Sequence, residues 1–308
     1  MGIVSNLYKK KFVCRYDKEI GVPYYSYTDF NGLFEESFSF INSIKTEIHY
    51  FFYYYENYRT DKLILFCPGI GPGHYAYFAE IDALAKNGYK VLTLDYTGCG
   101  DSKGSHLRSL NAPTRDVEDL LKHLHLDIPV VLVGHSLGGY TSLNIINLNN
   151  NITKAVIMSG FLDIPSLVNS MIKSKFIASR ILKYEQNVEK EYYALDNLSY
   201  LSNTKDDILF IQSKDDAVVP YEIALGKLSN ISNSHLKTIT LEDRKHNPNY
   251  SKSAIEYMNK VFVEYNYLLK KKKIKADSEK IEFFKDKSIQ KMTEQDEKII
   301  KSIVSFIN

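Results

Sequence analysis

Short apolar runs alternate with amphipathic stretches along the middle of the chain. Segments that consist of an apolar run, or begin with one, lie at 62–73, 90–104, 129–134 and 154–160. Stretches with helical spacing follow the first three, at 75–89, 114–126 and 137–148. Strands that alternate with helices build a mostly parallel sheet that is covered by helices on both faces. The pattern therefore predicts an α/β fold.

Strand-type segments also occur before and after this series. "ESFSFI" (36–41) and "TEIHYFFYYY" (46–55) are rich in β-branched and aromatic residues, which predicts two antiparallel strands or a hairpin. The sheet pattern resumes at "DILFIQSKDD" (207–216) and "HLKTITLED" (235–243). We therefore expect a sheet that is antiparallel only at its N-terminal edge.

Residues 161–205 interrupt the alternation, because they contain no obvious strand. Within them, residues 164–184 place their apolar side chains on one helical face. Such a face must be buried against something, and the carboxyl edge of the sheet is the surface that its own helices leave free. We therefore expect a helical cap or lid over 161–205; the same stripe would also suit a dimer contact.

The rest of the chain divides around this insertion. We expect an α/β core formed by 1–160 and 206–308, in which 1–35 is an N-terminal extension. Residues 251–290 form an extra helical segment, and "EQDEKIIKSIVSFIN" is the last helix.

Composition narrows the class of protein. Hydrophobic residues make up 44% and charged residues 25% of the 308 positions, as in ordinary globular proteins. The net charge of +2 gives no reason to expect nucleic acid as a partner. The three cysteines have no metal-ligand spacing, and the N-terminus has no secretory pattern, which together favour a reducing compartment. No window approaches the ~18 apolar residues of a spanning helix, so we expect a cytoplasmic protein.

The stretch "VVLVGHSLGGYTSL" (130–143) carries the strongest chemical signal. A G-x-S-x-G motif between a strand and a helix places its serine on a sharp, strained turn. Gly134 and Gly138 remove side chains that would collide there, so Ser136 stands exposed at the carboxyl edge of the sheet, where open α/β sheets bind ligands. The N–H of Leu137 then points to the place where an oxyanion would form.

A serine nucleophile needs a base, and the base needs an orienting acid, in the order Ser, acid, His. Of the two histidines downstream, His235 begins a predicted strand, whereas His246 lies in a loop just after that strand and is our candidate base. Asp216 directly precedes the turn "AVVP" and is our candidate acid. Asp215 beside it and Asp163 after an earlier strand are the alternatives.

The chain resembles the α/β-hydrolases, and within them the lipase-like and serine-aminopeptidase-like branch that includes monoacylglycerol lipases. The resemblance rests on "CPGIGPG", "DYTGCGDSKG", "GHSLGG", "SKDDAVVP" and "KHNP", and it covers about 36–250. It implies that the N–H of Ile70 joins that of Leu137 in an oxyanion hole, although Pro68 stands where the family usually has His. It also implies that "DYTGCGDS" is a tight structural turn beside the site.

The resemblance further implies that 161–205 occupies the position of the family's cap. In that position Leu167, Val168, Met171 and Ile172 would line an acyl pocket, and His74 and Tyr75 are candidates because they follow the oxyanion loop. The helix also carries Lys173, Lys175, Arg180 and Lys183. These side chains would either be solvated or touch an anionic substrate or membrane surface; a solvated face is the simpler expectation.

These observations predict a serine hydrolase that cleaves a carboxylic ester or related small acyl compound. No cofactor or metal is needed, and the sequence contains no phosphate loop, H-E-x-x-H or nucleotide fingerprint. Acyl transfer or peptide cleavage on the same three residues are alternatives, because the pocket selects the acceptor. A non-catalytic binder or sensor with this fold is an alternative of another class.

Overall fold

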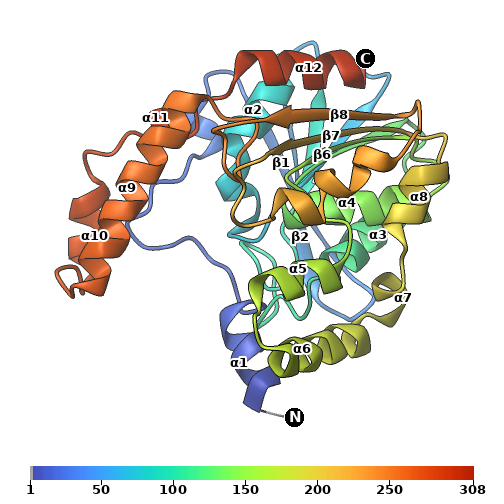
Figure 1. The fold of residues 1–308 in the computed structure, drawn as a ribbon. Helices are drawn as coiled ribbons and strands as arrows, with labels where there is room; N and C mark the ends of the chain where they lie inside the picture. Colours follow the sequence, from blue (N-terminus) through green and yellow to red (C-terminus); the bar gives the residue numbers. More distant parts are fainter. Residues whose placement is uncertain (1–2) are drawn as a thin grey trace.

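The computed structural model describes residues 3–308, which form an eight-stranded sheet with helices on both faces (Figure 1). The strands are β1 (Phe34–Ile41), β2 (Glu47–Tyr54), β3 (Leu63–Cys67), β4 (Lys90–Leu94), β5 (Val130–His135), β6 (Lys154–Met158), β7 (Asp207–Ser213) and β8 (Leu236–Leu241). Their order across the sheet is β1-β2-β4-β3-β5-β6-β7-β8. The pairs β1–β2 and β2–β4 are antiparallel and all other pairs are parallel. The predicted α/β class with an antiparallel N-terminal edge is confirmed.

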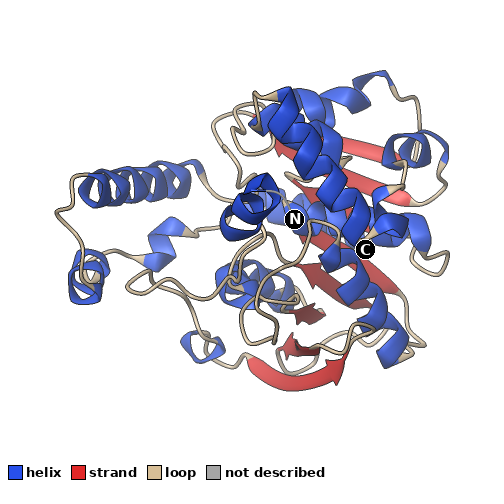
Figure 2. Cartoon of the chain, turned by 90° about the horizontal axis from the view of Figure 1, so that it is seen from below, coloured by secondary structure: helices blue, strands red, loops and turns tan. Residues whose placement is uncertain are grey.

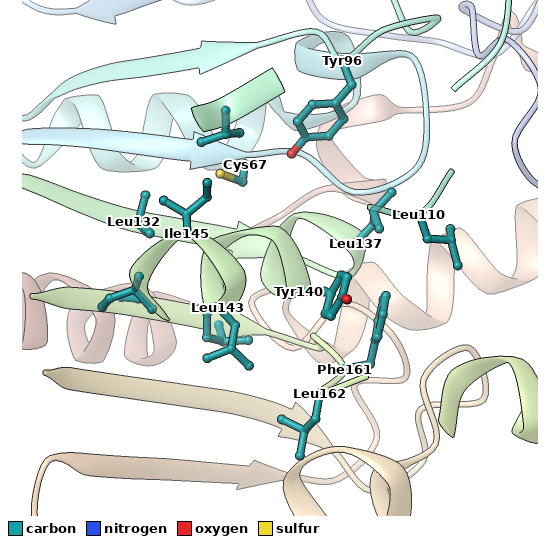
Figure 3. Packing of buried hydrophobic residues seen from close by; sticks show 14 of the residues in the cluster. Cys67, Tyr96, Leu110, Leu132, Leu137, Tyr140, Leu143, Ile145, Phe161 and Leu162 are labelled. Carbon is teal, nitrogen blue, oxygen red and sulfur yellow. The ribbon is translucent and has the colours of Figure 1, made fainter. Parts of the chain in front are cut away.

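Side chains alternate between the two faces of this sheet and build two core layers. Along β3, Leu63 and Leu65 join the layer under α3 (Ala112–Leu124) and α4 (Leu137–Leu148), whereas Ile64 and Phe66 join the other layer. That second layer lies under α2 (Phe78–Lys86) and α12 (Glu297–Ile307). Figure 3 shows part of the first layer, from Leu132 in the sheet to Phe161 at the strand ends. Strands buried on both faces explain the nearly continuous apolar runs in the sequence.

Four helices lie between β6 and β7, where the sequence predicted an insertion without strands. They are α5 (Ile164–Met171), α6 (Lys175–Val188), α7 (Lys190–Tyr193) and α8 (Asn197–Asn203). The predicted continuous helix over 164–184 is wrong in one respect, because the chain leaves helical geometry at Ile172 and restarts after Ser174. The Ser174 hydroxyl accepts a hydrogen bond from the N–H of Ile177 and caps α6, which favours a new helix over a continued one.

Helices at the two chain ends extend beyond the core. The N-terminal helix α1 (Ile3–Lys11) packs against α6, far from it in sequence (Figure 1). Near the other end, α9 (Lys252–Lys270), α10 (Asp277–Phe284) and α11 (Ile289–Met292) form an arm with a small apolar core of its own, which projects from the body in Figures 1 and 2. Within residues 3–308, no helix combines the length and apolarity needed to cross a membrane.

A buried carboxyl group ties α2 to the chain segment before α9. Glu80 is 5% exposed, and its Oε1 accepts a hydrogen bond of 2.9 Å from the Asn249 side chain. Burial raises the pKa of Glu80 to about 7, since the charged form loses its hydration. The folded protein therefore retains a proton that the unfolded chain gives up near its ordinary value of 4.5, so the group's contribution to stability falls as pH rises between these two values.

We expect Glu80→Gln to remove this pH dependence. The amide keeps an oxygen for Asn249 but cannot ionise. The free energy of unfolding of the variant, relative to wild type, should rise by roughly 2–3 kcal/mol from pH 5 to pH 8. Urea unfolding at both pH values measures this difference. The exposed Glu222→Gln is the matched control, and an equal pH response of both variants would contradict the prediction.

Candidate active site

Ser136 occupies a strained turn between β5 and α4. Its backbone angles are φ 55° and ψ −119°, which place a non-glycine residue in the left-handed half of conformational space. A Cβ atom on Gly134 would lie 2.2 Å from the carbonyl oxygen of Gly138, and one on Gly138 would lie 1.9 Å from that of Cys67. Both positions therefore require glycine. The turn leaves Ser136 partly exposed among buried neighbours.

The loop after β3 passes directly against this turn. A Cβ atom on Gly69 would lie 3.2 Å from the Cβ of Ser136. The N–H of Gly69 donates to the Tyr77 hydroxyl at 2.9 Å, so this amide is already used. By contrast, the N–H groups of Ile70 and Leu137 donate to no acceptor among residues 3–308. Two free amide donors beside one serine are the arrangement that stabilises a developing oxyanion.

His246 and Asp216 meet at the ends of the neighbouring strands. The Nδ1 atom of His246 lies 2.9 Å from Asp216 Oδ2. The Asp216 side chain is fully buried, and its Oδ1 accepts hydrogen bonds from the N–H groups of Val218 and Val219 at 2.9 and 3.0 Å. These hydrogen bonds hold the buried carboxyl group in place, and the carboxyl group in turn fixes the orientation of the ring beside it. The side chain of His246 is 18% exposed, so its other edge remains accessible.

The two alternative acids have other partners. Asp215 is exposed and accepts hydrogen bonds from the Ser213 hydroxyl and from the N–H of Lys245, so it braces the loop that carries His246. Asp163 caps α5 by accepting from the N–H of Ser166. The alternative base, His235, faces Asp207 at 3.0 Å at the beginning of β8. The structure therefore brings Asp216 into contact with His246, whereas Asp163 and His235 each have other partners.

A buried histidine inside the serine motif connects the turn, the glycine loop and His246. The Nε2 atom of His135 lies 2.7 Å from the carbonyl oxygen of His246, and its Nδ1 lies 2.9 Å from the Tyr77 hydroxyl. Burial lowers the pKa of His135 to about 3, so the ring is neutral at physiological pH. The neutral ring donates from Nε2 to His246 and accepts from Tyr77. Tyr77 in turn accepts the N–H of Gly69.

This connection was not predicted from the sequence. His135 appeared there only as the variable position of the motif, and Tyr77 only as part of an expected helix. The rings of His135 and His246 lie 4.8 Å apart between centroids, which brings His246 close to the residue after His135, Ser136. Among residues 3–308 no hydrogen bond joins the Ser136 hydroxyl to the His246 ring. The sequence offered one signal for these contacts: His135 stands at the end of a strand expected to be buried, and a buried histidine ring needs polar partners.

An apolar cavity of about 90 Å³ opens at Ser136. Apart from the Ser136 hydroxyl and one tyrosine, side chains without polar groups line it. Six of the lining residues belong to 161–205: Phe161 at its start and, from α5 into α6, Leu167, Val168, Met171, Ile172 and Ile181. Besides Ser136, the others are Tyr8, Phe12, Ile70, Leu110, Leu137, Val218 and Val219. The Lys173, Lys175, Arg180 and Lys183 side chains of the same segment are exposed.

His74 and Tyr75 are not among the residues that line this cavity. His74 is buried, and its Nδ1 lies 3.0 Å from Asp95 Oδ1, while Tyr75 donates to Asp101 at 3.0 Å. His74, Asp95 and Asp101 place potential metal-ligand atoms within 4.8 Å of one another. Hydrogen bonds already occupy these atoms: Asp95 also accepts the N–H groups of His74 and Asp101. The cluster fixes the tight turn after β4.

One cysteine lies beside the candidate site, but its thiol is not a candidate nucleophile. Cys67 ends β3 beside the glycine loop, and burial raises the pKa of its thiol to about 12. The thiol therefore stays protonated and is a poor nucleophile. Cys14, Cys67 and Cys99 are all free cysteines. Ser136 is thus the candidate nucleophile at this edge of the sheet.

The parallel sheet, the strained serine turn at its carboxyl edge and the helical insertion after β6 define an α/β-hydrolase. Residues 58–304 match the family model described as serine aminopeptidase, S33, and the chain belongs to this family of hydrolases. It is 45% identical over 58 residues to the mouse sn-1-specific diacylglycerol lipase ABHD11, a match that covers 19% of each chain. The chain thus spans only a small part of that relative in the alignment.

Solved structures show the same fold at low sequence identity. The Pyrococcus furiosus esterase Pf2001 superposes with a TM-score of 0.58 at 15% identity, covering 83% of this chain and 98% of that one. Est1E from Butyrivibrio proteoclasticus, solved with ferulic acid bound, gives a TM-score of 0.57 at 17% identity and covers 75% and 98%. These similarities support the fold assignment.

Proposed function

We propose that this protein is a serine hydrolase that cleaves small carboxylic esters with an apolar acyl group. The observation that carries the proposal is the strained Ser136 turn at the mouth of an apolar cavity, with the His246–Asp216 pair held close by through His135. In this proposal residues 161–205 act as the cap, the remaining chain forms the core, and the basic outer side of the cap is solvated. The free cysteines are consistent with the expected cytoplasmic location.

The proposed reaction proceeds in two halves. Ser136 Oγ attacks the ester carbonyl carbon while His246 Nε2 takes the hydroxyl proton, and the N–H groups of Ile70 and Leu137 hold the oxyanion. His246 then passes the proton to the leaving alkoxide, and the acyl group stays on Ser136. Water attacks this acyl-enzyme by the same steps in reverse and releases the acid. The first step needs a hydrogen bond between Ser136 and His246. Catalytic hydrogen bonds are often long in the absence of substrate and shorten when substrate binds.

The cavity lining supports an ester over a peptide substrate. An aminopeptidase must hold the charged amino group of its substrate, and a buried ammonium group needs a carboxylate partner. No Asp or Glu lies among the cavity-lining residues found in 3–308. Acyl transfer uses the same acyl-enzyme, so it differs only in the acceptor and stays the second candidate.

A panel of p-nitrophenyl esters, together with labelling by a fluorophosphonate, tests this proposal. We expect ester turnover, and covalent labelling that maps to Ser136. Aminoacyl p-nitroanilides should be poor substrates, because the cavity offers no partner for their ammonium group. Faster cleavage of the anilides would favour a peptidase, and the absence of both turnover and labelling would favour a non-catalytic binder.

We expect the acyl group to bind along the cap side of the cavity. Each methylene buried there should add up to about 0.8 kcal/mol to transition-state binding, or about fourfold in kcat/KM. The rate constant kcat/KM should therefore rise from acetate to about hexanoate or octanoate esters. Met171→Asp should flatten this rise, because a carboxylate at the cavity lip opposes burial of methylenes.

The matched control is Leu198→Asp, which places the same charge on α8 at an exposed residue outside the cavity lining. This variant should keep the wild-type dependence on acyl length, and both variants should still be labelled at Ser136. An unchanged preference for acetyl esters in wild type and in Met171→Asp would remove this helix from the substrate site.

A further inference from the structure

The N-terminal helix α1 borders the same cavity as Ser136. Tyr8, on α1, and Phe12, just after it, are among the lining residues, although the family match begins only at residue 58. The Tyr8 ring packs on Phe12 and on Tyr184 of α6, with centroids 5.7 and 5.8 Å away. Figure 1 shows α1 and α6 together, with α5 between them and the sheet. An element outside the matched family core therefore completes the cavity wall.

A buried hydrogen-bonded carboxyl group fastens α1 to the cap. The Tyr8 hydroxyl donates to Glu185 Oε1 at 2.7 Å, and the N–H of Leu110 donates to Glu185 Oε2 at 2.9 Å. Glu185 is fully buried. Moving Tyr8 away would leave a buried carboxyl oxygen without its partner, which is costly. Leu110 also lines the cavity. The Glu185 carboxyl group therefore fixes α1, α6 and the segment around Leu110 relative to one another.

The chain just after α1 is anchored to the core. Tyr16 forms a parallel bridge with Cys99: its N–H donates to the carbonyl of Gly98 and its carbonyl accepts the N–H of Gly100, both at 2.9 Å. Its hydroxyl donates to the carbonyl of Phe12 at 2.7 Å. The backbone of Phe12 is thereby held at the cavity while its side chain remains half-buried. α1 is therefore a fixed part of the wall and not a loose tail.

Resting on the proposed esterase function, we propose that Phe12 and the helix before it form the stop that sets the longest acyl chain the site accepts. The cavity measures about 90 Å³, so its lining limits the length of the acyl chain that it accepts. The wall formed by Tyr8 and Phe12 is held by the Glu185 and Tyr16 contacts. A longer chain therefore meets the Phe12 ring, the one large apolar side chain that this segment places at the cavity.

The test varies the size of this stop. Phe12→Ala should move the acyl length with maximal kcat/KM upward by about two to three carbons, because the lost ring volume can hold methylenes, and Phe12→Trp should move it downward. Esters from acetate to dodecanoate measure the profile. Dissociation constants of the saturated acids from butanoate to tetradecanoate, measured by calorimetry with Ser136→Ala protein carrying each Phe12 substitution, measure the same dependence without turnover.

Phe176→Ala is the matched control, since Phe176 on α6 is 63% exposed and is not among the cavity-lining residues. Its profiles should match those of wild type. Opposite shifts for Phe12→Ala and Phe12→Trp support the inference. Profiles of both variants that coincide with the control would overturn it. If the acids bind with shifted profiles but no ester is hydrolysed, the proposed function fails while the role of Phe12 stands.

Discussion

Ser136→Ala should lower kcat for ester hydrolysis by roughly 10⁴- to 10⁶-fold, the scale found when a serine nucleophile is removed. In the proposed mechanism the acyl group is transferred to Oγ, so without this atom no acyl-enzyme can form, and only the proposed oxyanion donors and the binding cavity remain. The substitution removes one atom from a partly exposed side chain, so the fold should be unaffected. Burst and steady-state kinetics with a p-nitrophenyl ester measure the loss.

Ser159→Ala provides the matched control. Ser159 follows β6, also has a positive φ (47°), and is buried at the same edge of the sheet, but it is not among the cavity-lining residues. Its variant should retain activity within a few-fold of wild type and should still be labelled by the fluorophosphonate. Retention of most esterase activity by Ser136→Ala would refute the assigned nucleophile.

Local sequence signals predicted the elements that hold the candidate site. Gly134 and Gly138 mark a turn whose geometry leaves no space for side chains, so the position of Ser136 followed from the motif itself. Asp216 and His246 could be placed because each follows a strand, and the carboxyl ends of parallel strands meet at one edge. Each of these inferences needed only the residues next to a strand end.

Contacts between distant segments could not be predicted in this way. Tyr77 and His135 are joined by a hydrogen bond across 58 positions, and Tyr8 and Glu185 across 177. Neither pair forms a spacing pattern, since such pairs are set by how helices pack on the finished sheet. His74 was expected to line the pocket because it follows the glycine loop. Instead, its ring contacts the buried Asp95 carboxyl group at the turn after β4. Sequence proximity to a site is thus a weaker guide than position at a strand end.

The connection through His135 has a mechanistic consequence. Its ring forms hydrogen bonds with the carbonyl of His246 and with the Tyr77 hydroxyl. The Tyr77 hydroxyl in turn accepts the N–H of Gly69, the residue before Ile70. The loop that carries the proposed base, His246, and the loop that carries the proposed oxyanion donor, Ile70, are therefore held by one neutral imidazole. Its low pKa keeps this pattern of donors and acceptors unchanged over the physiological pH range. His135 should therefore not contribute to the pH dependence of catalysis in this range.

The pair Asp215 and Asp216 allows a sharp test of the orienting acid. Asp216→Asn should lower kcat by roughly 10²- to 10⁴-fold, because an amide cannot balance the charge of protonated His246 and favours the wrong tautomer of the ring. The fully buried Asp216 carboxylate lies 2.9 Å from His246 Nδ1, so no water can replace it easily.

Asp215→Asn is the matched control, with the same substitution one residue earlier. Asp215 accepts from the Ser213 hydroxyl and the N–H of Lys245, and an asparagine oxygen can accept both bonds. Its variant should therefore lose little activity and should keep the wild-type pH–rate profile. If Asp215→Asn were the damaging substitution, the assignment of Asp216 as the orienting acid would be wrong by one residue. Measuring kcat for both variants against wild type separates these cases, because only Asp216→Asn removes the carboxylate that contacts the ring.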